Sequence, residues 1–349
     1  MLKFLTKNLI CPSCKNTSVN LMLHVFKEGL KGHVKDGVLV CSFCNSWYPI
    51  ENNILELLPP NMAYEDDRKK FYNRFISSLK KINIKKNNIK QPETPTSEPP
   101  QLLQQKHFDW YAENNQQTYD EYEQMPFWQA VDNRIIKDWK QIMKPGGVLL
   151  DIACGNGRSS FPHVSMCTVI GFDIAKKAIE RANQRAIEMG CEDKVTFFVG
   201  DATNPPFKDR SFDFVQTYGA LHHLPNPHLV TADIQRVLKI GGIHFGLENN
   251  KTVLRGIFDL MMKIFPIWVE EAGDEPLISK KMIYDWLQGF PVSITCGTST
   301  YLPPQLLNFV GLKMSKFLLN ISDYSLSLLP LIKHQGGLIF FQIKKQNFN

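Results

Sequence analysis

A glycine-rich turn with an acid at its start is the first group of residues that could hold a small molecule. The turn runs from Asp151 to Gly157 and reads Asp-Ile-Ala-Cys-Gly-Asn-Gly, directly after an apolar run at 148–150. Gly155 and Gly157 allow a sharp bend and let a ligand lie against bare main chain. We expect a helix to begin after this turn, with N-terminal amides that favour an anionic group.

Two further acids follow apolar runs downstream. Asp173 ends the run that begins at residue 168, 22 residues after the acid of the turn, and Asp201 follows the run at 195–200. An acid at about this offset in an α/β unit typically accepts hydrogen bonds from ribose hydroxyls. Ligands of parallel sheets bind beyond the carboxyl ends of the strands, so we expect these acids and Tyr218 at one edge of one sheet.

Strands and helices must alternate along the chain to place these residues. Strands are predicted at 148–150, 168–173, 195–200, 212–218 and 243–247, helices at 127–143, 175–189 and 229–238, and a turn at 239–242. This alternation predicts a parallel sheet with helices on both faces. Residues 336–342 are predicted as a final strand, with 291–296 as its neighbour.

The motifs of this region resemble those of class I S-adenosylmethionine-dependent methyltransferases, nearest to the type 11 set, which acts mostly on small molecules and lipids. Six segments occur in the order and spacing of that family: Asp151–Gly157, Gly171–Asp173, Gly200–Ala202, Phe212–Val215, Leu221–Leu224 and Val237–Gly242. The resemblance covers about residues 125 to 250 and implies a Rossmann-like α/β fold with a seven-stranded sheet. The topology of that family also implies that the final strand, 336–342, is antiparallel and lies at the sheet edge. A nicotinamide-dependent Rossmann enzyme is disfavoured, because Ser159 stands where such an enzyme has its third glycine.

The resemblance also implies S-adenosyl-L-methionine as the cofactor and a role for matched positions. The turn would hold the methionine part, Asp173 the ribose hydroxyls, and Asp201 and the Ala202 N–H the adenine edge. Tyr218 would line the space beside the sulfonium methyl. The predicted cofactor-binding set is Asp151, Ala153, Gly155, Asn156, Gly157, Asp173, Ile174, Asp201, Ala202 and Tyr218.

His222 and His223 are the candidates for a catalytic base. Methyl transfer from a sulfonium depends mainly on positioning, and it needs a base only if the acceptor must lose a proton. An unperturbed imidazole titrates near neutral pH and could take that proton. In the family this segment often shapes the pocket without acting as a base, so both interpretations stay open.

Four of the eight cysteines form two Cys-x-x-Cys pairs, Cys11 with Cys14 and Cys41 with Cys44, separated by 26 residues. Two such pairs make a tetrahedral thiolate site for structural Zn²⁺, and a hairpin with strands at 21–26 and 38–40 fills the interval. The alternative is two disulfides, which suit a secreted protein. The first residues lack the sustained apolar core of a signal peptide, so we expect zinc in a cytoplasmic protein.

The cysteine-rich segment also resembles the small zinc-ribbon protein that activates tRNA and translation-factor methyltransferases. The resemblance rests on Cys11–Lys15, Cys41–Cys44, Trp47–Ile50 and Ile54–Pro59. It implies a structural role for the metal, since a ribbon of about 60 residues has too little core to fold alone. We expect the metal site to stabilise the fold of this segment, and the segment also to offer a docking surface.

The two resemblances and the composition of the stretch between them divide the chain into three regions: a zinc-ribbon domain at 1–60, a partly flexible linker at 61–106, and a methyltransferase domain at 107–349. The linker is rich in lysine and then in proline between residues 80 and 101. Two apolar insertions, at about 251–290 and 302–334, include Ile257, Met261 and Trp268. They either pack as core or form an apolar acceptor pocket or a membrane-facing lid. Charges interrupt both, so neither is predicted to span a membrane.

The net charge of +6 is mild, and no arginine-rich stripe or aromatic–basic ladder occurs, so nucleic acid is not expected as a partner. We predict methyl transfer from S-adenosylmethionine to a small acceptor, apolar or lipid-linked, by a cytoplasmic protein that could also touch a membrane peripherally. The first alternative is an RNA or translation-protein methyltransferase that uses the ribbon as a docking module. The second is a non-enzymatic scaffold that keeps the fold.

Overall fold

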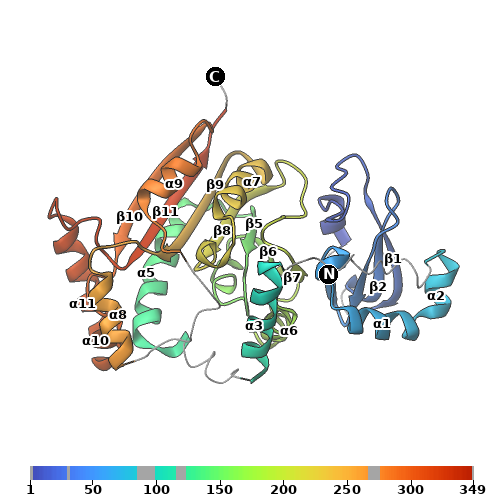
Figure 1. Ribbon diagram of the computed structural model, residues 1–349, viewed down its shortest axis with the longest axis horizontal. Helices are drawn as coiled ribbons and strands as arrows, with labels where there is room; N and C mark the ends of the chain where they lie inside the picture. Colours follow the sequence, from blue (N-terminus) through green and yellow to red (C-terminus); the bar gives the residue numbers. More distant parts are fainter. Residues whose placement is uncertain (1–2, 30–31, 85–98, 115–122, 266–275, 348–349) are drawn as a thin grey trace.

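The protein is built on one sheet of eleven strands in the order β1-β2-β3-β4-β7-β6-β5-β8-β9-β11-β10 (Figure 1). The computed structural model describes residues 3–29, 32–84, 99–114, 123–265 and 276–347. Trp268 lies outside the described residues, and so does most of the lysine- and proline-rich part of the predicted linker.

Parallel strands form the centre of the sheet. β5 (Val148–Ile152), β6 (Thr168–Asp173), β7 (Val195–Gly200) and β8 (Phe212–Tyr218) are parallel to one another, and β9 (Leu238–Asn249) is parallel to β8. Every residue of β7 is buried, as expected for a parallel strand covered on both faces. β11 (Leu338–Lys345) is antiparallel to both β9 and β10 (Val292–Ser299). The final strand is therefore not at the edge as predicted: β10 occupies the edge, and β11 lies between β10 and β9.

Helices cover both faces of this central part. α5 (Pro126–Ile142) and α6 (Lys176–Glu188) contribute to one core cluster and α7 (Pro227–Val237) to another, while α3 (Pro100–Asn114) packs on α6. α6 buries the alanine-rich stripe Ala178, Ala182 and Ala186, and Gly190 ends the segment with a φ of 62°. One core cluster contains Phe172 and Phe198, and a second contains Trp139.

Two local predictions in this region are wrong. No α-helix follows the glycine turn: residues 158–167 form turns and a short 3-10 helix, Phe161–His163, with Pro162 inside it. Asp151 accepts hydrogen bonds from the Ser159 and Ser160 hydroxyls, which holds this segment folded back under the turn. The predicted turn at 239–242 is part of β9, where the pairing with β8 shifts register between Phe212 and Phe214.

The cysteine-rich segment supplies the other four strands, so the sheet has eleven strands where seven were predicted. β1 (Leu21–Glu28), β2 (Val34–Cys41), β3 (Trp47–Glu51) and β4 (Ile54–Leu57) are antiparallel neighbours. β4 then pairs in parallel with β7, with Glu56 opposite Val199 and Leu57 opposite Gly200. The seven strands β5 to β11 would otherwise leave β7 as an exposed edge.

The segment predicted as a linker contains two helices, α1 (Glu65–Arg74) and α2 (Ile76–Lys81), and the first part of α3. Phe71 and Leu79 from these helices join Val38, Val40 and Trp47 in a third hydrophobic cluster. The two helices therefore pack on the strands of the ribbon.

The apolar insertions supply a cap at the end of the molecule opposite the ribbon, formed by α8 (Arg255–Ile264), α10 (Pro304–Phe309) and α11 (Gly311–Ser327) (Figure 1). α9 (Lys280–Trp286) lies apart from this cap and packs against α7. α10 and α11 pack against α5. The buried Asp323 of α11 pairs with Arg134 of α5 and accepts hydrogen bonds from Ser299 Oγ at 2.5 Å and Thr300 N at 2.9 Å. None of the helices in the described ranges is long and apolar enough to cross a bilayer.

The buried ion pair at the ribbon junction generates a stability prediction. Arg68 Nε lies 2.7 Å from Glu56 Oε1, both side chains are 5% exposed, and Arg68 also donates to the Leu58 carbonyl. Glu56→Ala leaves a buried guanidinium without its carboxylate, so we expect a loss of about 3–5 kcal/mol in the free energy of unfolding, measured by urea denaturation. Arg74→Ala, on the same helix but in an exposed pair with Glu51, should change it by about 1 kcal/mol or less. Equal effects of the two variants would contradict this account.

Candidate functional site

A cavity of about 190 Å³ lies at the carboxyl ends of β5, β6, β7 and β8, bounded on one side by α3. Eight residues of the predicted cofactor-binding set line it: Ala153, Gly155, Asn156, Asp173, Ile174, Asp201, Ala202 and Tyr218. Asp151 and Gly157 do not. The structure thus brings the predicted residues to one place, while their role in binding stays a prediction.

The turn after β5 has an unusual main-chain path. Ala153, Gly155 and Gly157 have φ angles of 54°, 53° and 80°, a left-handed conformation that favours glycine. A Cβ atom on Gly157 would lie 2.8 Å from the Phe161 ring and 3.0 Å from the Phe197 ring. Gly157 is therefore needed for packing beneath the turn, and Gly155 presents main chain to the cavity.

Asp173 joins the turn to the end of β6. Its Oδ2 accepts from Gly155 N and its Oδ1 from Ala175 N, both at 2.9 Å. Burial raises the pKa of this carboxyl above its usual value, and the hydrogen bonds from the two N–H groups offset only part of that rise. Each carboxylate oxygen has a second lone pair, so Asp173 can also accept hydrogen bonds from hydroxyl groups of a ligand in the cavity.

Asp151 lies beneath the cavity rather than in its wall. It is fully buried, and its Oδ2 accepts from Ser159 Oγ at 3.1 Å and Ser160 Oγ at 2.5 Å. Burial raises the pKa of this carboxyl to about 6, although the hydroxyl donors lower it. Asp151 can therefore hold the turn in shape but cannot contact a ligand from this position.

Asp201 opens the loop after β7. Its Oδ1 accepts from Thr203 N and Thr203 Oγ1, both at 2.8 Å, and burial raises its pKa. Lys15 of the ribbon lowers that pKa through its charge, so the first cysteine knuckle lies within electrostatic range of the cavity. From α3, Gln101 donates to Thr203 Oγ1 at 3.3 Å.

A polar wall that the sequence did not reveal faces the turn. Arg158 makes a bidentate pair with Asp132 of α5, with contacts of 2.8 to 3.0 Å, and Tyr218 OH donates to the same carboxylate at 2.5 Å. Glu123 accepts from Asn156 Nδ2 at 2.6 Å and pairs with Arg185. Arg158 and Glu123 both line the cavity. The sequence signal that could have indicated this wall is the acid Asp132, which lies close to the buried Trp128 and Val131 on one amphipathic helix.

The two candidate base residues occupy different positions. His223 lines the cavity, and its ring meets the Phe108 ring edge-on with centroids 5.2 Å apart. His222 is buried behind it, with Nδ1 2.6 Å from Glu248 Oε2. Glu248 Oε1 also accepts from the main-chain N–H groups of Ala220 and Leu221. His222 is therefore placed to position the segment, and only His223 can meet a ligand in the cavity.

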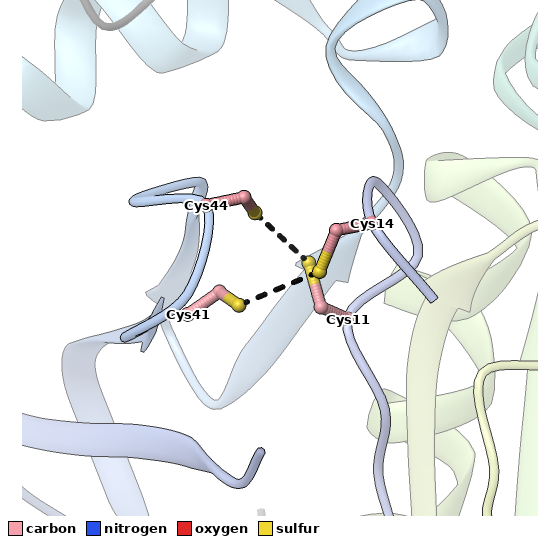
Figure 2. Close-up of side chains that lie close together, drawn as sticks. All are labelled: Cys11, Cys14, Cys41 and Cys44. Atoms are coloured by element: carbon pink, nitrogen blue, oxygen red, sulfur yellow. Dashed lines mark hydrogen bonds between the residues drawn. The ribbon is translucent and has the colours of Figure 1, made fainter. Parts of the chain in front are cut away.

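The four predicted metal ligands converge in the ribbon (Figure 2). The Sγ atoms of Cys11, Cys14, Cys41 and Cys44 all lie within 4.8 Å of one another. Cys11 Sγ is 3.6 Å from Cys44 Sγ, and Cys14 Sγ is 3.7 Å from Cys41 Sγ. Ligands at a Zn–S distance of about 2.3 Å in a tetrahedron lie about 3.8 Å apart, so this cluster fits a closed tetrahedral thiolate site.

Two segments of the chain match known protein families. Residues 150–246 match the family model described as a methyltransferase domain, and residues 3–53 match the model described as a Trm112p-like protein. The 27-O-demethylrifamycin SV methyltransferase of Amycolatopsis mediterranei is 41% identical over 105 residues, which cover 29% of this chain and 38% of that protein. The demethylmenaquinone methyltransferase of Staphylococcus aureus is 30% identical over 162 residues, 44% of this chain and 66% of that protein.

These relatives match only part of the chain, and the chain spans 38% and 66% of their lengths. The crystal structure of the (4+2)-cyclase SpnF has a TM-score of 0.50 at 17% identity, covering 73% of this chain and 98% of that chain. This likeness shows a shared fold and confirms the Rossmann-like α/β class. The chain thus combines a segment that matches a Trm112p-like protein, residues 3–53, with a segment that matches a methyltransferase domain, residues 150–246.

Proposed function

We propose that this protein transfers a methyl group from S-adenosylmethionine to a small acceptor that is apolar or lipid-linked. The observation that carries the proposal is the meeting of the left-handed turn at 153–157, the carboxylate of Asp173 and the end of β7 around one cavity. Such an arrangement offers main-chain groups, a carboxylate that can accept hydrogen bonds from hydroxyl groups, and a loop N–H around one cavity. These features suit the amino-acid, ribose and base parts of the cofactor.

The residues of the cavity would act mainly by orientation. The turn would hold the methionine part, Asp173 would accept from the ribose hydroxyls, and Ala202 N–H would meet the adenine edge. When bound, the cofactor supplies an electrophilic methyl group, and fixing an acceptor in line with it lowers the barrier. Tyr218, held by Asp132, would form a rigid wall beside the reacting atoms.

The acceptor class follows from the rest of the wall. Phe108, Ala112, Leu224 and Pro225 give the cavity an apolar side next to His223. Two relatives are named for small organic acceptors, 27-O-demethylrifamycin SV and demethylmenaquinone. An apolar acceptor with an ionisable hydroxyl or carbon acid would use both the apolar wall and a base at His223.

Zinc at the four cysteines is part of the same proposal. The ribbon contacts the loop after Asp201 directly, because Ile10 N donates to the Pro206 carbonyl at 2.9 Å and Lys208 N donates to the Asn8 carbonyl at 2.8 Å. Leu9 and Phe207 form an isolated bridge and belong to one core cluster. A metal at Cys11 and its partners would hold this edge of the cofactor cavity as well as the ribbon itself.

A second candidate is favoured by the match of residues 3–53 to the Trm112p-like model. In this candidate the acceptor is an RNA or a translation protein, and the ribbon contributes to docking. Deleting the ribbon is not a clean test, because β4 and the shared core would be lost with it.

Untargeted profiling of label transferred by the intact protein into cell extract decides between the candidates. A product in the lipid or small-molecule fraction supports the first, label in RNA or protein supports the second, and no product with any extract supports a non-enzymatic scaffold.

The cofactor assignment predicts the effect of removing Asp173. Asp173→Ala loses charge-assisted hydrogen bonds to ribose hydroxyls and the tie to Gly155, so we expect S-adenosylmethionine to bind at least about 100-fold more weakly in isothermal titration calorimetry. Asp193→Asn, an exposed acid after α6, serves as control and should leave the affinity unchanged. Failure of the unaltered protein to bind the cofactor would overturn the proposed function.

A second prediction separates the two histidines. His223→Gln should lower the rate of methyl transfer by about 100-fold, because the base at the cavity is lost. The rate is followed with the acceptor found by profiling. The exposed His228→Gln is the control and should keep the rate. An unchanged rate for His223→Gln would exclude a base at this position.

The metal site gives a third prediction. The purified protein should contain one zinc per chain by plasma mass spectrometry, and Cys14→Ser should lose the metal and unfold at lower temperature, since metal binding contributes folding energy. Cys296→Ser replaces a cysteine outside the cluster and should retain the zinc. Equal zinc content in the two variants would argue against a four-cysteine site.

A further inference from the structure

The cap helices carry two apolar stripes that face solvent. On and just before α8 the stripe consists of Val253, Ile257, Leu260 and Ile264, and on and just after α11 it consists of Met314, Phe317, Ile321, Tyr324 and Leu328. All nine side chains are between 49% and 84% exposed. Their spacing of three and four residues places each set on one side of its helix. The opposite side of α11 is buried through Ser315, Leu319 and Asp323, so the outward stripe is additional to the face used for packing.

The two stripes belong to one surface. Gln305 of α10 donates to the Phe265 carbonyl, which directly follows α8, at 3.1 Å, and α10 packs on α11. Figure 1 shows these three helices together at the end of the molecule away from the ribbon. Phe265, Phe309 and Leu331 are also exposed. Such a concentration of exposed large side chains marks an interaction surface.

Among the described residues, the charges around the stripes are mostly positive. Residues 251–265 and 304–334 contain six lysines and arginines and two acids. The acids are both in ion pairs, Asp259 with Arg255 and Asp323 with Arg134. The four acids of residues 266–275, which follow α8 in the sequence, lie outside the described residues. Lys263 follows Leu260 by three residues and Lys313 precedes Phe317 by four, so both lie beside the stripes.

A basic cavity extends this surface at the start of α8. It has a volume of about 190 Å³ and is lined by Lys251, Lys280, Lys281 and His334, together with Ser279 and other uncharged residues. Burial lowers the pKa of His334, and the positive charges of Lys280 and Lys333 lower it further. No acid is among the described residues that line the cavity. Its chemistry suits the phosphate of a lipid headgroup.

The surface lies at the same sheet edge as the cofactor cavity. β9 is parallel to β8, and β10 is parallel to β9 because each is antiparallel to β11. The carboxyl ends of β9 and β10 therefore share the edge that holds the cavity. α8 follows β9, and α10 and α11 follow β10.

We infer that the surface formed by the two stripes and the basic cavity docks on an anionic lipid membrane. A bilayer interface accepts apolar side chains between its headgroups and attracts lysines to its phosphates. A second copy is a poorer occupant, because an isologous contact would bring two positively charged rims together. The inference rests on the proposed function only in making the membrane the source of the lipid-linked acceptor.

Vesicle co-sedimentation of the full chain tests the inference. The protein should bind vesicles of phosphatidylcholine with about 30% phosphatidylglycerol more tightly than pure phosphatidylcholine, and high salt should weaken the binding. Phe317→Ser combined with Ile321→Ser should reduce the partition coefficient at least about tenfold. Lys313→Glu should reduce it about fivefold or more.

The matched control is Ile187→Ser combined with Leu229→Ser, which removes two similarly exposed apolar side chains from α6 and α7. Binding should be unchanged in this variant, and calorimetry should show that all variants still bind S-adenosylmethionine. Absence of vesicle binding by the unaltered chain, an equal loss in the control, or a dimer by light scattering that Phe317→Ser with Ile321→Ser disperses would each overturn the inference. Vesicle binding without cofactor binding would instead overturn only the proposed function.

Discussion

Parallel pairing of β7, β6, β5 and β8 is the constraint on which the candidate site depends. Parallel strands end at one edge, so four segments that are up to 65 residues apart, between residues 153 and 218, meet around one cavity. Asp173 illustrates the consequence: it ends β6 and accepts a hydrogen bond from Gly155, which follows β5. The site is therefore held by the sheet, and the loops need only turn sharply enough to present main-chain groups.

The same pairing explains why the ribbon is part of the site. β7 would be an exposed edge without β4, and the loop that leaves β7 carries Asp201. The ribbon covers this edge, contacts the loop at Pro206 and Lys208, and brings the charge of Lys15 near Asp201. A module that contains the cluster of four cysteines thus supports the adenine end of the proposed cofactor site. Loss of the proposed zinc is expected to disturb this end of the cavity before the turn after β5.

Much of the central sheet could be predicted, because strands that are buried on both faces appear in the sequence as short apolar runs. β7 and β8 begin and end where the runs do, and the four cysteines converge as their spacing indicated. The pairing of β4 with β7 joins segments more than 130 residues apart and leaves no local signal. The missing helix after Gly157 has a different cause, since the buried Asp151 holds Ser159 and Ser160 in a turn. Glu123 and Arg158 were missed because ion-paired residues of a cavity wall have the same types as surface residues.

The cap and the cavity are connected through α5, which links the proposed docking surface to the site. On one side of this helix Arg134 pairs with Asp323 of α11, and on the other Asp132 holds Arg158 and Tyr218. Two residues of one helix therefore link the buried face of α11 to the polar wall of the cavity. Because the stripe of α11 faces away from α5, contact with a bilayer leaves these ion pairs intact. An apolar acceptor could then pass from the surface to the cavity along one sheet edge while the wall that orients it stays in place.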